Sequence, residues 1–361
     1  MIVESEQIVG NSMKAIVRTR YGPPEILQLE EVEKPIPNDV RGVLVKIYSS
    51  SVNPADRYDL KPPFLIRLIS PLFRLGMGVR GPKDRGLGSD AAGRVEAVRG
   101  NVTQFKPGDE VFGSCLASYA EYAVARENRL ALKPVNSSFE ECAAVPIAGL
   151  TALQALRDKG QIQPGQKVLI NGAGGGVGTF AVQIAKSFGA EVTAVTNTAN
   201  LDMVRSLGAD HVIDYTKEDF AKNGERYDLI CDIAASHSIP EYKRIMNPNG
   251  ICVVVGIRDK IIRGLLYFLI RGRLLSRGDK KFVFFIAKIN QNDLNYMRDL
   301  LETKKVVPVI DRRYSLDETA QAISYLIEGH ARGKIIITVD HNNDKPSWSD
   351  SLVSKKREGS R

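Results

Sequence analysis

Two patterns of hydrophobic and polar positions divide the chain near Pro146. Before it, short runs rich in β-branched residues are separated by turn sequences such as YGPP and KPGDE, which indicates an all-β region. After it, apolar runs of strand length alternate with segments of helical periodicity. Strands are predicted over residues 14–19, 42–52, 91–98, 109–113, 119–124, 167–172, 191–196, 227–234 and 250–256, and helices over 151–159, 177–188, 201–207 and around Tyr242.

The alternation in the second region is typical of a doubly wound parallel sheet, so the predicted fold class is α/β, with a β domain preceding that sheet. Two further helices, over residues 292–303 and 316–328, precede a β run, KIIITV, that has no sheet of its own. We therefore expect this run to return to the first domain. The predicted organisation is an overhang (1–12), a β domain (13–146), a parallel-sheet domain (147–288), a return segment (289–340) and a mobile polar tail (341–361).

Composition narrows the class of protein. The 361 residues are 43% hydrophobic and 25% charged, which excludes disorder throughout the chain. The longest apolar runs fall far short of the roughly 20 residues that a transmembrane helix needs. Four cysteines lie far apart, with no C-x-x-C and no Cys/His cluster, so neither a zinc ribbon nor a disulfide framework is expected. The N-terminus does not read as a signal peptide, and a reduced, cytoplasmic location is expected.

A glycine-rich turn is the strongest local motif. In VLINGAGGGVGTFAVQIAKSFGAEVTAVT, a β run enters the turn, a helix follows at once, and a second β run comes next. The spacing is Ala173-x-Gly175-x-x-Gly178, with Gly176 and Val177 opening the helix and alanine in place of the first glycine of G-x-G-x-x-G. Glycines here let the backbone approach a pyrophosphate at the helix N-terminus. The motif therefore predicts dinucleotide binding.

The end of the second β run distinguishes the two nicotinamide coenzymes. An Asp or Glu there would accept hydrogen bonds from the ribose 2′-hydroxyl and repel a 2′-phosphate. This chain has Thr196, Asn197 and Thr198 instead, which favours NADPH over NADH. A polar loop that discriminates weakly is the alternative. Arg205 and Tyr215 could border the phosphate, or could be a surface charge and a packing aromatic.

Three separated segments carry a resemblance to a known family. GSDAAGRVEAVRGNVTQFKPGDEVFG (88–113), AAVPIAGLTALQAL (143–156) and the glycine-rich turn resemble the medium-chain dehydrogenase/reductase superfamily. Within it, SSVNPADRYDL (50–60) looks like the zinc-independent quinone oxidoreductase branch. The resemblance covers residues 13 to about 339. It implies a GroES-like β domain holding the substrate, an inserted Rossmann domain, and an active site in the cleft between them.

The resemblance also bears on metal chemistry. Zinc-dependent relatives carry a catalytic cysteine where this chain has Asn53, and a Gly-His-Glu where it has Gly88, Ser89 and Asp90. Neither Asn53 nor Ser89 is a plausible zinc ligand, so no metal is expected. Two carboxylates, Asp56 and Asp90, remain near the cleft; in this family such positions mostly hold loops in place, and a catalytic role is the alternative.

Without a metal, the acceptor must already be activated by conjugation, as in a quinone or an α,β-unsaturated carbonyl. Tyr58 matches a tyrosine that faces the nicotinamide in relatives, where it either donates to the carbonyl oxygen or lines the pocket. Asn53 would orient the side of the pocket that Tyr58 forms, or the nicotinamide amide. The Thr151 hydroxyl would lie against the nicotinamide. The remaining coenzyme contacts implied are at strand ends: Ala234, Ala235, Gly256 and Ile257.

Two apolar stretches hold the excess positive charge. Residues 61–85 carry six basic residues against one acid, and residues 258–281 carry eight against two. Their net +11 exceeds the +8 of the whole chain, so the rest is slightly acidic. Such stretches could line the substrate cleft, form a homodimer contact, or lie on an anionic membrane surface. No recognised RNA-binding motif accompanies them, and nucleic acid is the least favoured partner.

These observations predict a zinc-independent, NADPH-dependent reductase of a small lipophilic quinone or enone. Reduction of a 2-enoyl thioester is the first alternative, which would need room and cationic side chains for an acyl carrier. The second, from another class, is a NADPH-binding interaction or membrane-associated protein with little turnover.

Overall fold

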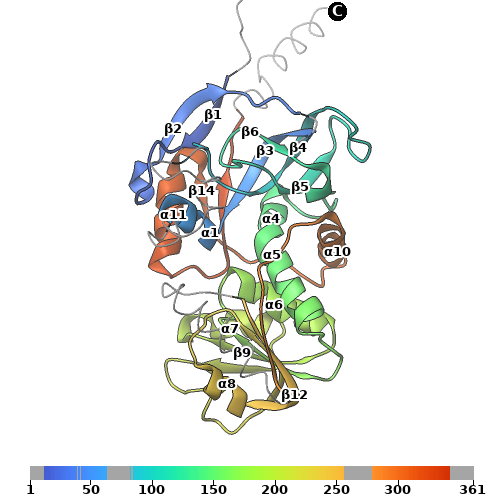
Figure 1. Ribbon diagram of the computed structural model, residues 1–361, viewed down its shortest axis with the longest axis vertical. Coiled ribbons are helices and arrows are strands. Elements are labelled where there is room, and N and C mark those ends of the chain that lie inside the picture. The colour runs from blue at the N-terminus through green and yellow to red at the C-terminus, as the bar shows by residue number, and fades with distance from the viewer. Residues whose placement is uncertain are drawn as a thin grey trace, which may run out of the picture.

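The computed structural model describes residues 12–38, 40, 42–62, 82, 84–255 and 279–341. These residues form two main sheets, one above the other in Figure 1, with helix α5 (Pro146–Leu153) passing between them. Residues 1–11 of the predicted overhang, Gly256, Ile257, residues 342–361 of the tail and most of the two basic stretches lie outside the described residues. Among the described residues no helix is both long enough and apolar enough to cross a membrane.

The first sheet is a largely antiparallel β structure of the kind expected for a GroES-like domain. Its strand order is β14-β15-β3-β4-β5-β7, and β6 pairs with β3. Strand β15 pairs antiparallel with β3, with Ile335 opposite Val52, so a C-terminal segment completes an N-terminal sheet. The strands are β3 (Val43–Val52), β4 (Asp90–Val98), β5 (Glu110–Ser114), β6 (Tyr122–Ala125), β7 (Leu130–Leu132), β14 (Ile310–Ser315) and β15 (Lys334–Thr338), beside a separate pair, β1 (Ser12–Val17) and β2 (Gln28–Glu33).

The second sheet has six parallel strands in the order β10-β9-β8-β11-β12-β13. From β8 to β10 successive strands are added on one side, and from β11 to β13 on the other, so a topological switch point lies between β8 and β11. Ligands bind at the carboxyl ends of the strands at such a point. The strands are β8 (Lys167–Asn171), β9 (Glu191–Thr196), β10 (His211–Asp214), β11 (Tyr227–Asp232), β12 (Met246–Val254) and β13 (Lys281–Phe284). This confirms the α/β fold class: a GroES-like domain with a Rossmann-type doubly wound sheet.

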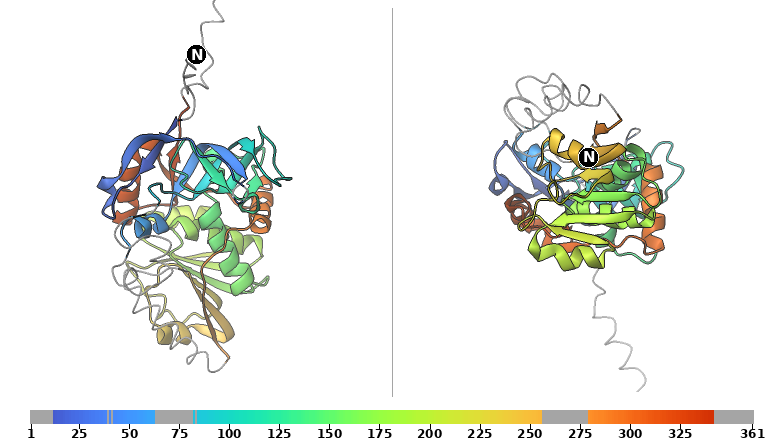
Figure 2. Two further views of the ribbon diagram at one scale, coloured as in Figure 1. Left: turned by 45° about the horizontal axis from the view of Figure 1, so that its top comes forward. Right: turned by 90° about the horizontal axis from the view of Figure 1, so that it is seen from below.

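Helices cover both faces of the parallel sheet, as the view from below in Figure 2 shows. Helix α6 (Gly176–Ser187) buries Phe180 and Ile184 against one face, and α8 (Ile239–Arg244) buries Tyr242 against the other. The remaining helices are α1 (Pro54–Leu60), α4 (Phe139–Ala143), α7 (Leu201–Ser206), α10 (Gln291–Glu302) and α11 (Thr319–Glu328), with short turns η1 (Pro24–Ile26), η2 (Glu127–Arg129), η3 (Gln154–Lys159), η4 (Thr198–Asn200) and η5 (Leu316–Glu318).

Helix α5 begins five residues before its predicted start at residue 151. Pro146 occupies its first turn, where the missing N–H costs no hydrogen bond, and the Ile147 N–H donates to Asp90 Oδ1 at 3.0 Å. The Asp90 carboxylate of β4 thus caps this helix. The sequence around Pro146 does not reveal such a cap, because Asp90 is distant in the chain. One apolar core then runs from Phe112 of the first sheet through Leu153 of α5 to Ile170 of the second. This core holds the two domains together.

Candidate active site

The glycine-rich turn links β8 to α6 at the switch point of the parallel sheet. Gly172 has φ +93°, a left-handed conformation that favours glycine. A Cβ added at Gly178 would lie 2.1 Å from Gly172 O and 2.6 Å from Ala173 Cα, so only glycine lets the helix pack this closely on the turn. Ala173 is itself fully buried, whereas Gly175, Gly176 and Val177 stay partly accessible at the helix N-terminus. The turn therefore has the shape of a pyrophosphate cradle.

Polar side chains converge beside this cradle, at the end of β9. A Cβ added at Gly174 would lie 2.6 Å from Thr196 Oγ1 and 2.5 Å from Asn200 Nδ2. Asn197 Oδ1 and Asn200 Oδ1 are buried and have no hydrogen-bond partner among the residues that the structure describes. Buried acceptors normally have partners, and the hydroxyls or amino groups of a bound nucleotide would supply them. Asn200 was not among the residues predicted from the sequence.

Strand β9 does not end in an acidic residue, but an aspartate of the neighbouring strand, Asp214, lies next to Thr198. Asp214, the last residue of β10, pairs in register with Thr196, and its carboxylate accepts hydrogen bonds from the hydroxyls of Thr198 and Thr216. These bonds, Thr198 first, lower the pKa of Asp214 to about 2. Next along the chain, Tyr215 is 59% exposed and its N–H donates to Thr196 O at 3.0 Å. The carboxylate is thus bonded to neighbouring hydroxyls.

Three further residues were predicted near the coenzyme: Arg205 beside the phosphate, and Ala234 and Ala235 at the end of a strand. Arg205 is exposed and pairs with Asp202 at 3.0 Å on its own helix. Ala234 follows β11 and is partly buried, and its N–H donates to Asn171 O at 3.3 Å across the switch point. Ala235, the next residue, has φ +47°. Ala234 thus lies at the carboxyl edge of the sheet, where the nicotinamide half of a dinucleotide would extend.

A buried polar cluster lies on the GroES-like side of the junction, around Asn53. Asn53 Nδ2 donates to Asp90 Oδ2 at 2.8 Å, and Asn53 Oδ1 accepts from Lys334 Nζ at 2.7 Å. Ser51 Oγ also donates to Asp90 Oδ2, at 2.8 Å. All four side chains are at most 3% exposed. Both ends of the Asn53 amide are therefore bonded within the protein, and its predicted orienting role would be exerted through these bonds.

A second carboxylate, Asp56, adjoins this cluster. Its Oδ2 accepts from the Tyr119 hydroxyl at 2.6 Å and from the Asn53 N–H at 2.7 Å, which starts helix α1. Burial raises the pKa of Asp56 to about 7. Tyr58 lies one half-turn further along α1 and is partly buried, as is Thr151 on α5. Tyr119 and Lys334 were missed by sequence reasoning, since nothing local marks a tyrosine or lysine as part of a buried polar cluster.

Asp56 makes stability depend on pH in a predictable direction. An aspartate has a pKa near 3.9 when unfolded, so between about pH 4 and 7 the folded chain holds a proton that the unfolded chain has released. The free energy of unfolding should therefore fall as pH rises through this window, by up to about 1.4 kcal/mol per pH unit. Urea unfolding at pH 5.5, 6.5 and 7.5 measures the slope. Asp56→Asn should flatten it; an equal slope in both proteins would assign the titration to other groups.

Metal ligands are not assembled in the part of the chain that the structure describes. No group of three His, Cys, Asp or Glu side chains there could hold a metal ion. All four cysteines are buried as free thiols, and burial raises the pKa of Cys115, Cys142 and Cys231 to about 12. A protonated thiol is a poor metal ligand and a poor nucleophile.

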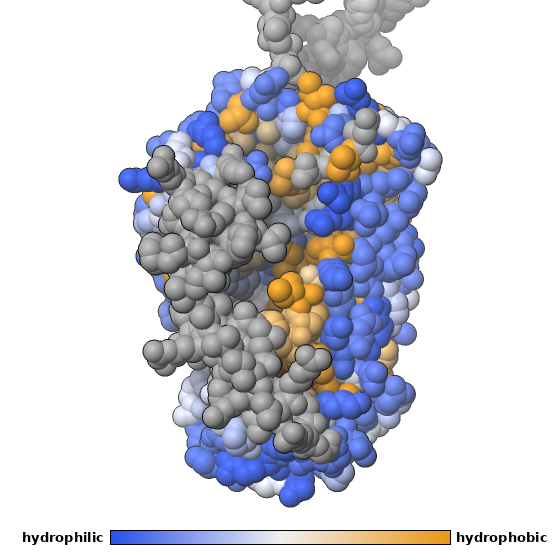
Figure 3. Space-filling model, in the orientation of Figure 1, coloured by the Kyte–Doolittle hydropathy of each residue, from blue (hydrophilic) through white to orange (hydrophobic). Residues whose placement is uncertain are grey.

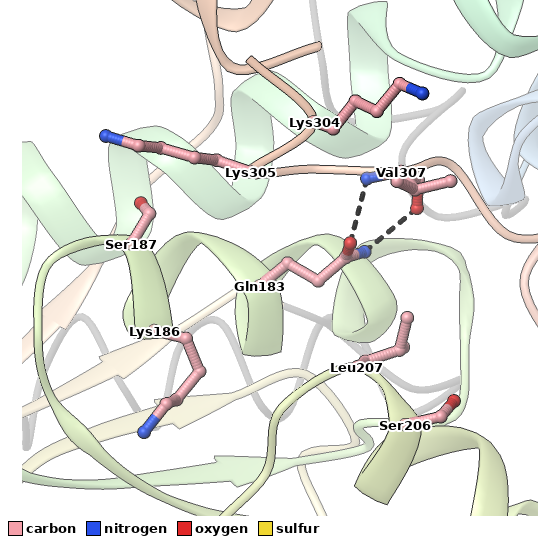
Figure 4. A pocket seen from close by; sticks show the side chains of 8 residues that line it. All are labelled: Gln183, Lys186, Ser187, Ser206, Leu207, Lys304, Lys305 and Val307. Atoms are coloured by element: carbon pink, nitrogen blue, oxygen red, sulfur yellow. Dashed lines mark hydrogen bonds between the residues drawn. The ribbon is translucent and has the colours of Figure 1, made fainter.

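The surface around the junction is partly apolar. On the face drawn in Figure 3, apolar side chains gather near the middle of the molecule, at the level where the two sheets meet. A separate hollow of about 530 Å³ lies at the other end of α6, between that helix, α7 and the loop after α10. Figure 4 shows its lining, where Gln183 bonds to Val307 and the Lys186 side chain points away from Gln183. The Lys186 ammonium lies 2.7 Å from the Asp210 carboxylate. This hollow is distinct from the cradle.

Comparison with known proteins identifies the class. A family described as "Alcohol dehydrogenase GroES-like domain" matches residues 39–154, and one described as "Zinc-binding dehydrogenase" matches residues 207–337. With the GroES-like sheet and the glycine-rich turn of the parallel sheet, these matches define a medium-chain dehydrogenase/reductase. The chain belongs to that superfamily and is an NAD(P)H-dependent oxidoreductase of its quinone oxidoreductase-like group.

Particular relatives show how near the resemblance is. The chain is 33% identical to the 2-methylene-furan-3-one reductase of Solanum lycopersicum, over 91% of this chain and 80% of that protein. It is 30% identical to the NADPH-dependent alkenal/one oxidoreductase, chloroplastic, of Arabidopsis thaliana, over 93% and 82%. The solved quinone oxidoreductase of Coxiella burnetii superposes with a TM-score of 0.77 at 28% identity, covering 91% of this chain and all of that one.

Proposed function

We propose that this protein is an NADPH-dependent reductase that transfers hydride to a quinone or an α,β-unsaturated carbonyl without zinc. The observation that carries the proposal is the junction at Gly176, where a Cβ would lie 3.1 Å from Lys334 Cδ. The coenzyme cradle and the buried cluster of the GroES-like domain therefore meet at one place. NADPH would supply a hydride there, and the fold would bring the acceptor to it in a site shielded from water.

The chain's own residues have separable roles in this proposal. The turn from Gly172 to Gly178 holds the pyrophosphate, and Thr196 with Asn197 and Thr198 surrounds the adenosine ribose. Thr151 on α5 contacts the nicotinamide. Tyr58 on α1 lines the acceptor pocket or donates a hydrogen bond to the developing enolate oxygen. The names of the relatives, which include an alkenal/one oxidoreductase and quinone oxidoreductases, support this acceptor class.

The preference for NADPH is tested at the end of β9. Thr196→Asp should place a carboxylate beside the ribose 2′ position, where it repels a 2′-phosphate and accepts from a 2′-hydroxyl. We expect the ratio of kcat/KM for NADPH to that for NADH to fall at least tenfold. Thr196→Asn, which removes no charge and adds none, is the matched control and should change the ratio little. An unchanged ratio in the aspartate variant would place coenzyme selectivity elsewhere.

The reaction is tested with a panel of naphthoquinones, enones and 2-enoyl thioesters, by following the absorbance of reduced nicotinamide. Quinone or enone turnover without added zinc, in protein found by metal analysis to hold far less than one zinc per chain, is the expected result. Turnover restricted to enoyl thioesters would favour the acyl-carrier alternative. NADPH binding with no turnover would favour a coenzyme-binding protein of another class. A cytoplasmic location stays a prediction. So do the roles considered for the two basic stretches, which are contact with a lipophilic substrate, with a second copy of the chain or with a membrane surface.

A further inference from the structure

Lys334 is a buried cation at the point where the two domains meet. It is the first residue of β15, is 3% exposed, and belongs to the segment that returns to the GroES-like sheet. Its ammonium donates to Asn53 Oδ1 at 2.7 Å and to Val52 O at 3.2 Å, and lies 3.6 Å from Asp90 Oδ2. Burying a charged group is costly unless such partners are in place, so together these contacts offset the cost of holding the lysine there.

The ammonium determines which way the Asn53 amide points. An ammonium has donors and no acceptor, so the amide must turn its oxygen toward Lys334 and its NH₂ toward Asp90. The same residue is the N-cap of α1, and its N–H donates to Asp56 Oδ2 in the first turn. Because Lys334 and Asp90 hold the Asn53 side chain in place, they also position the start of α1, the helix that carries Tyr58.

A second line of contacts runs from the same ammonium to α5. Asp90 Oδ2 faces the cation and Asn53, while Oδ1 accepts the Ile147 N–H at 3.0 Å in the first turn of α5. Thr151 lies four residues later, one turn along the same helix. The lysine stem meanwhile lies on Gly176, the first residue of α6. Lys334 thus contacts the cradle directly. Through Asn53 it is linked to α1, and through Asp90 to α5, the two helices that carry Tyr58 and Thr151.

We propose that Lys334 is a positioning residue, which holds α1 and α5 at a fixed place relative to the coenzyme cradle and thereby orders the nicotinamide end of the coenzyme. The inference rests on the proposed function, since it assigns the nicotinamide to Tyr58 and Thr151. The charged groups facing the ammonium are Asp90 from β4 and Asp56 from α1. Both carboxyl groups raise the pKa of Lys334 against the effect of burial.

The test compares two ligands that differ in the part Lys334 is proposed to order. NADPH carries the nicotinamide, and 2′,5′-ADP carries only the adenosine end. In Lys334→Met, which keeps the stem against Gly176 and removes the ammonium, NADPH affinity measured by calorimetry should fall about tenfold while 2′,5′-ADP affinity stays unchanged. Lys186→Met is the matched control, because Lys186 lies ten residues, or about 15 Å, further along α6 and pairs with exposed Asp210. It should bind both ligands like the wild-type protein.

Equal losses for both ligands in Lys334→Met would show a general loss of structure and overturn the inference, as would no loss for either. If Lys334→Met does not fold, Asn53→Asp decides in the same assay. It keeps the contact with the ammonium and the size of the side chain but replaces the donor to Asp90 with a carboxylate. NADPH should again weaken selectively; unchanged NADPH affinity would overturn the inference.

Kinetics supply a readout that a purely structural role would not move. In Lys334→Met, kcat should fall while KM for the acceptor changes little, and the loss should deepen at low pH. The reason is that Lys334 lowers the pKa of Asp90 against the effect of burial, so without it Asp90 protonates more readily. Combined with Asn53→Ala, Lys334→Met should cost little further activity; additive losses would contradict action through Asn53. Wild-type protein that binds NADPH but reduces no acceptor would overturn the proposed function alone, and the binding comparison would still judge this inference.

Discussion

Replacing Gly178 with alanine should abolish detectable coenzyme binding and lower the melting temperature by several degrees. The added Cβ would lie 2.1 Å from Gly172 O and 2.6 Å from Ala173 Cα, and both neighbours are backbone that cannot swing aside. Either the turn opens or α6 moves off β8, and each change removes N–H groups from the position of the pyrophosphate. Small-to-large changes in packed sites typically destabilise by about 1–3 kcal/mol. NADPH titration and a thermal melt measure the two effects.

Gly175→Ala, in the same turn, should weaken coenzyme binding without lowering the melting temperature. Gly175 is the N-cap of α6 with φ −91°, which any residue adopts, and the nearest atom to an added Cβ is Gly172 O at 3.8 Å. The apoprotein should therefore melt like the wild type, while NADPH binds at least tenfold more weakly because the methyl group lies where the backbone approaches the pyrophosphate. Unchanged NADPH affinity in both variants would mean that the coenzyme lies elsewhere.

The sequence predicts those parts of the candidate site that depend on local conformation. Gly175 and Gly178 were recognisable because a turn that approaches a ligand and a helix that packs on a strand each restrict the residue at one position. The parallel sheet followed from alternating periodicities, and its order places the glycine turn at the switch point. The family resemblance added Asn53, Tyr58 and Thr151, whose roles have no local signal and stay predictions.

The remaining residues depend on contacts between distant segments. Lys334 and Asn53 are 281 positions apart, and Tyr119 and Asp56 are 63 apart. A lysine at the start of KIIITV looks like an ordinary solvated charge, and only the pairing of β15 with β3 buries it. Likewise, the sequence shows no acid at the end of β9, yet parallel pairing with β10 brings Asp214 to Thr198. Burial and charge pairing are properties of the assembled sheets.

Replacing Asp90 with asparagine should lower the free energy of unfolding by about 3–5 kcal/mol, because it breaks a buried ion pair and leaves the Lys334 ammonium inside the protein. Asp90 is fully buried, and each of its carboxylate oxygens accepts from an N–H: Oδ1 from Ile147, Oδ2 from Asn53. An amide NH₂ at either position would face another donor. Asp210→Asn is the matched control, since its partner Lys186 is in a part-exposed pair expected to contribute under about 1 kcal/mol.

The pH dependence of Asp90→Asn identifies the unpaired lysine as the cause of the loss. Burial already lowers the pKa of Lys334, and Asp90 opposes that effect, so without Asp90 the folded protein binds this proton still more weakly. An unfolded lysine has a pKa near 10.4, and between the lowered folded value and 10.4 the unfolded chain holds more protons. The free energy of unfolding of Asp90→Asn should therefore recover relative to wild type as pH rises from 7 to 9.5, as urea unfolding would measure. A deficit that is constant with pH would assign the loss to the mismatched amide instead of the charge, and a deficit no larger than that of Asp210→Asn would show that the ion pair contributes little.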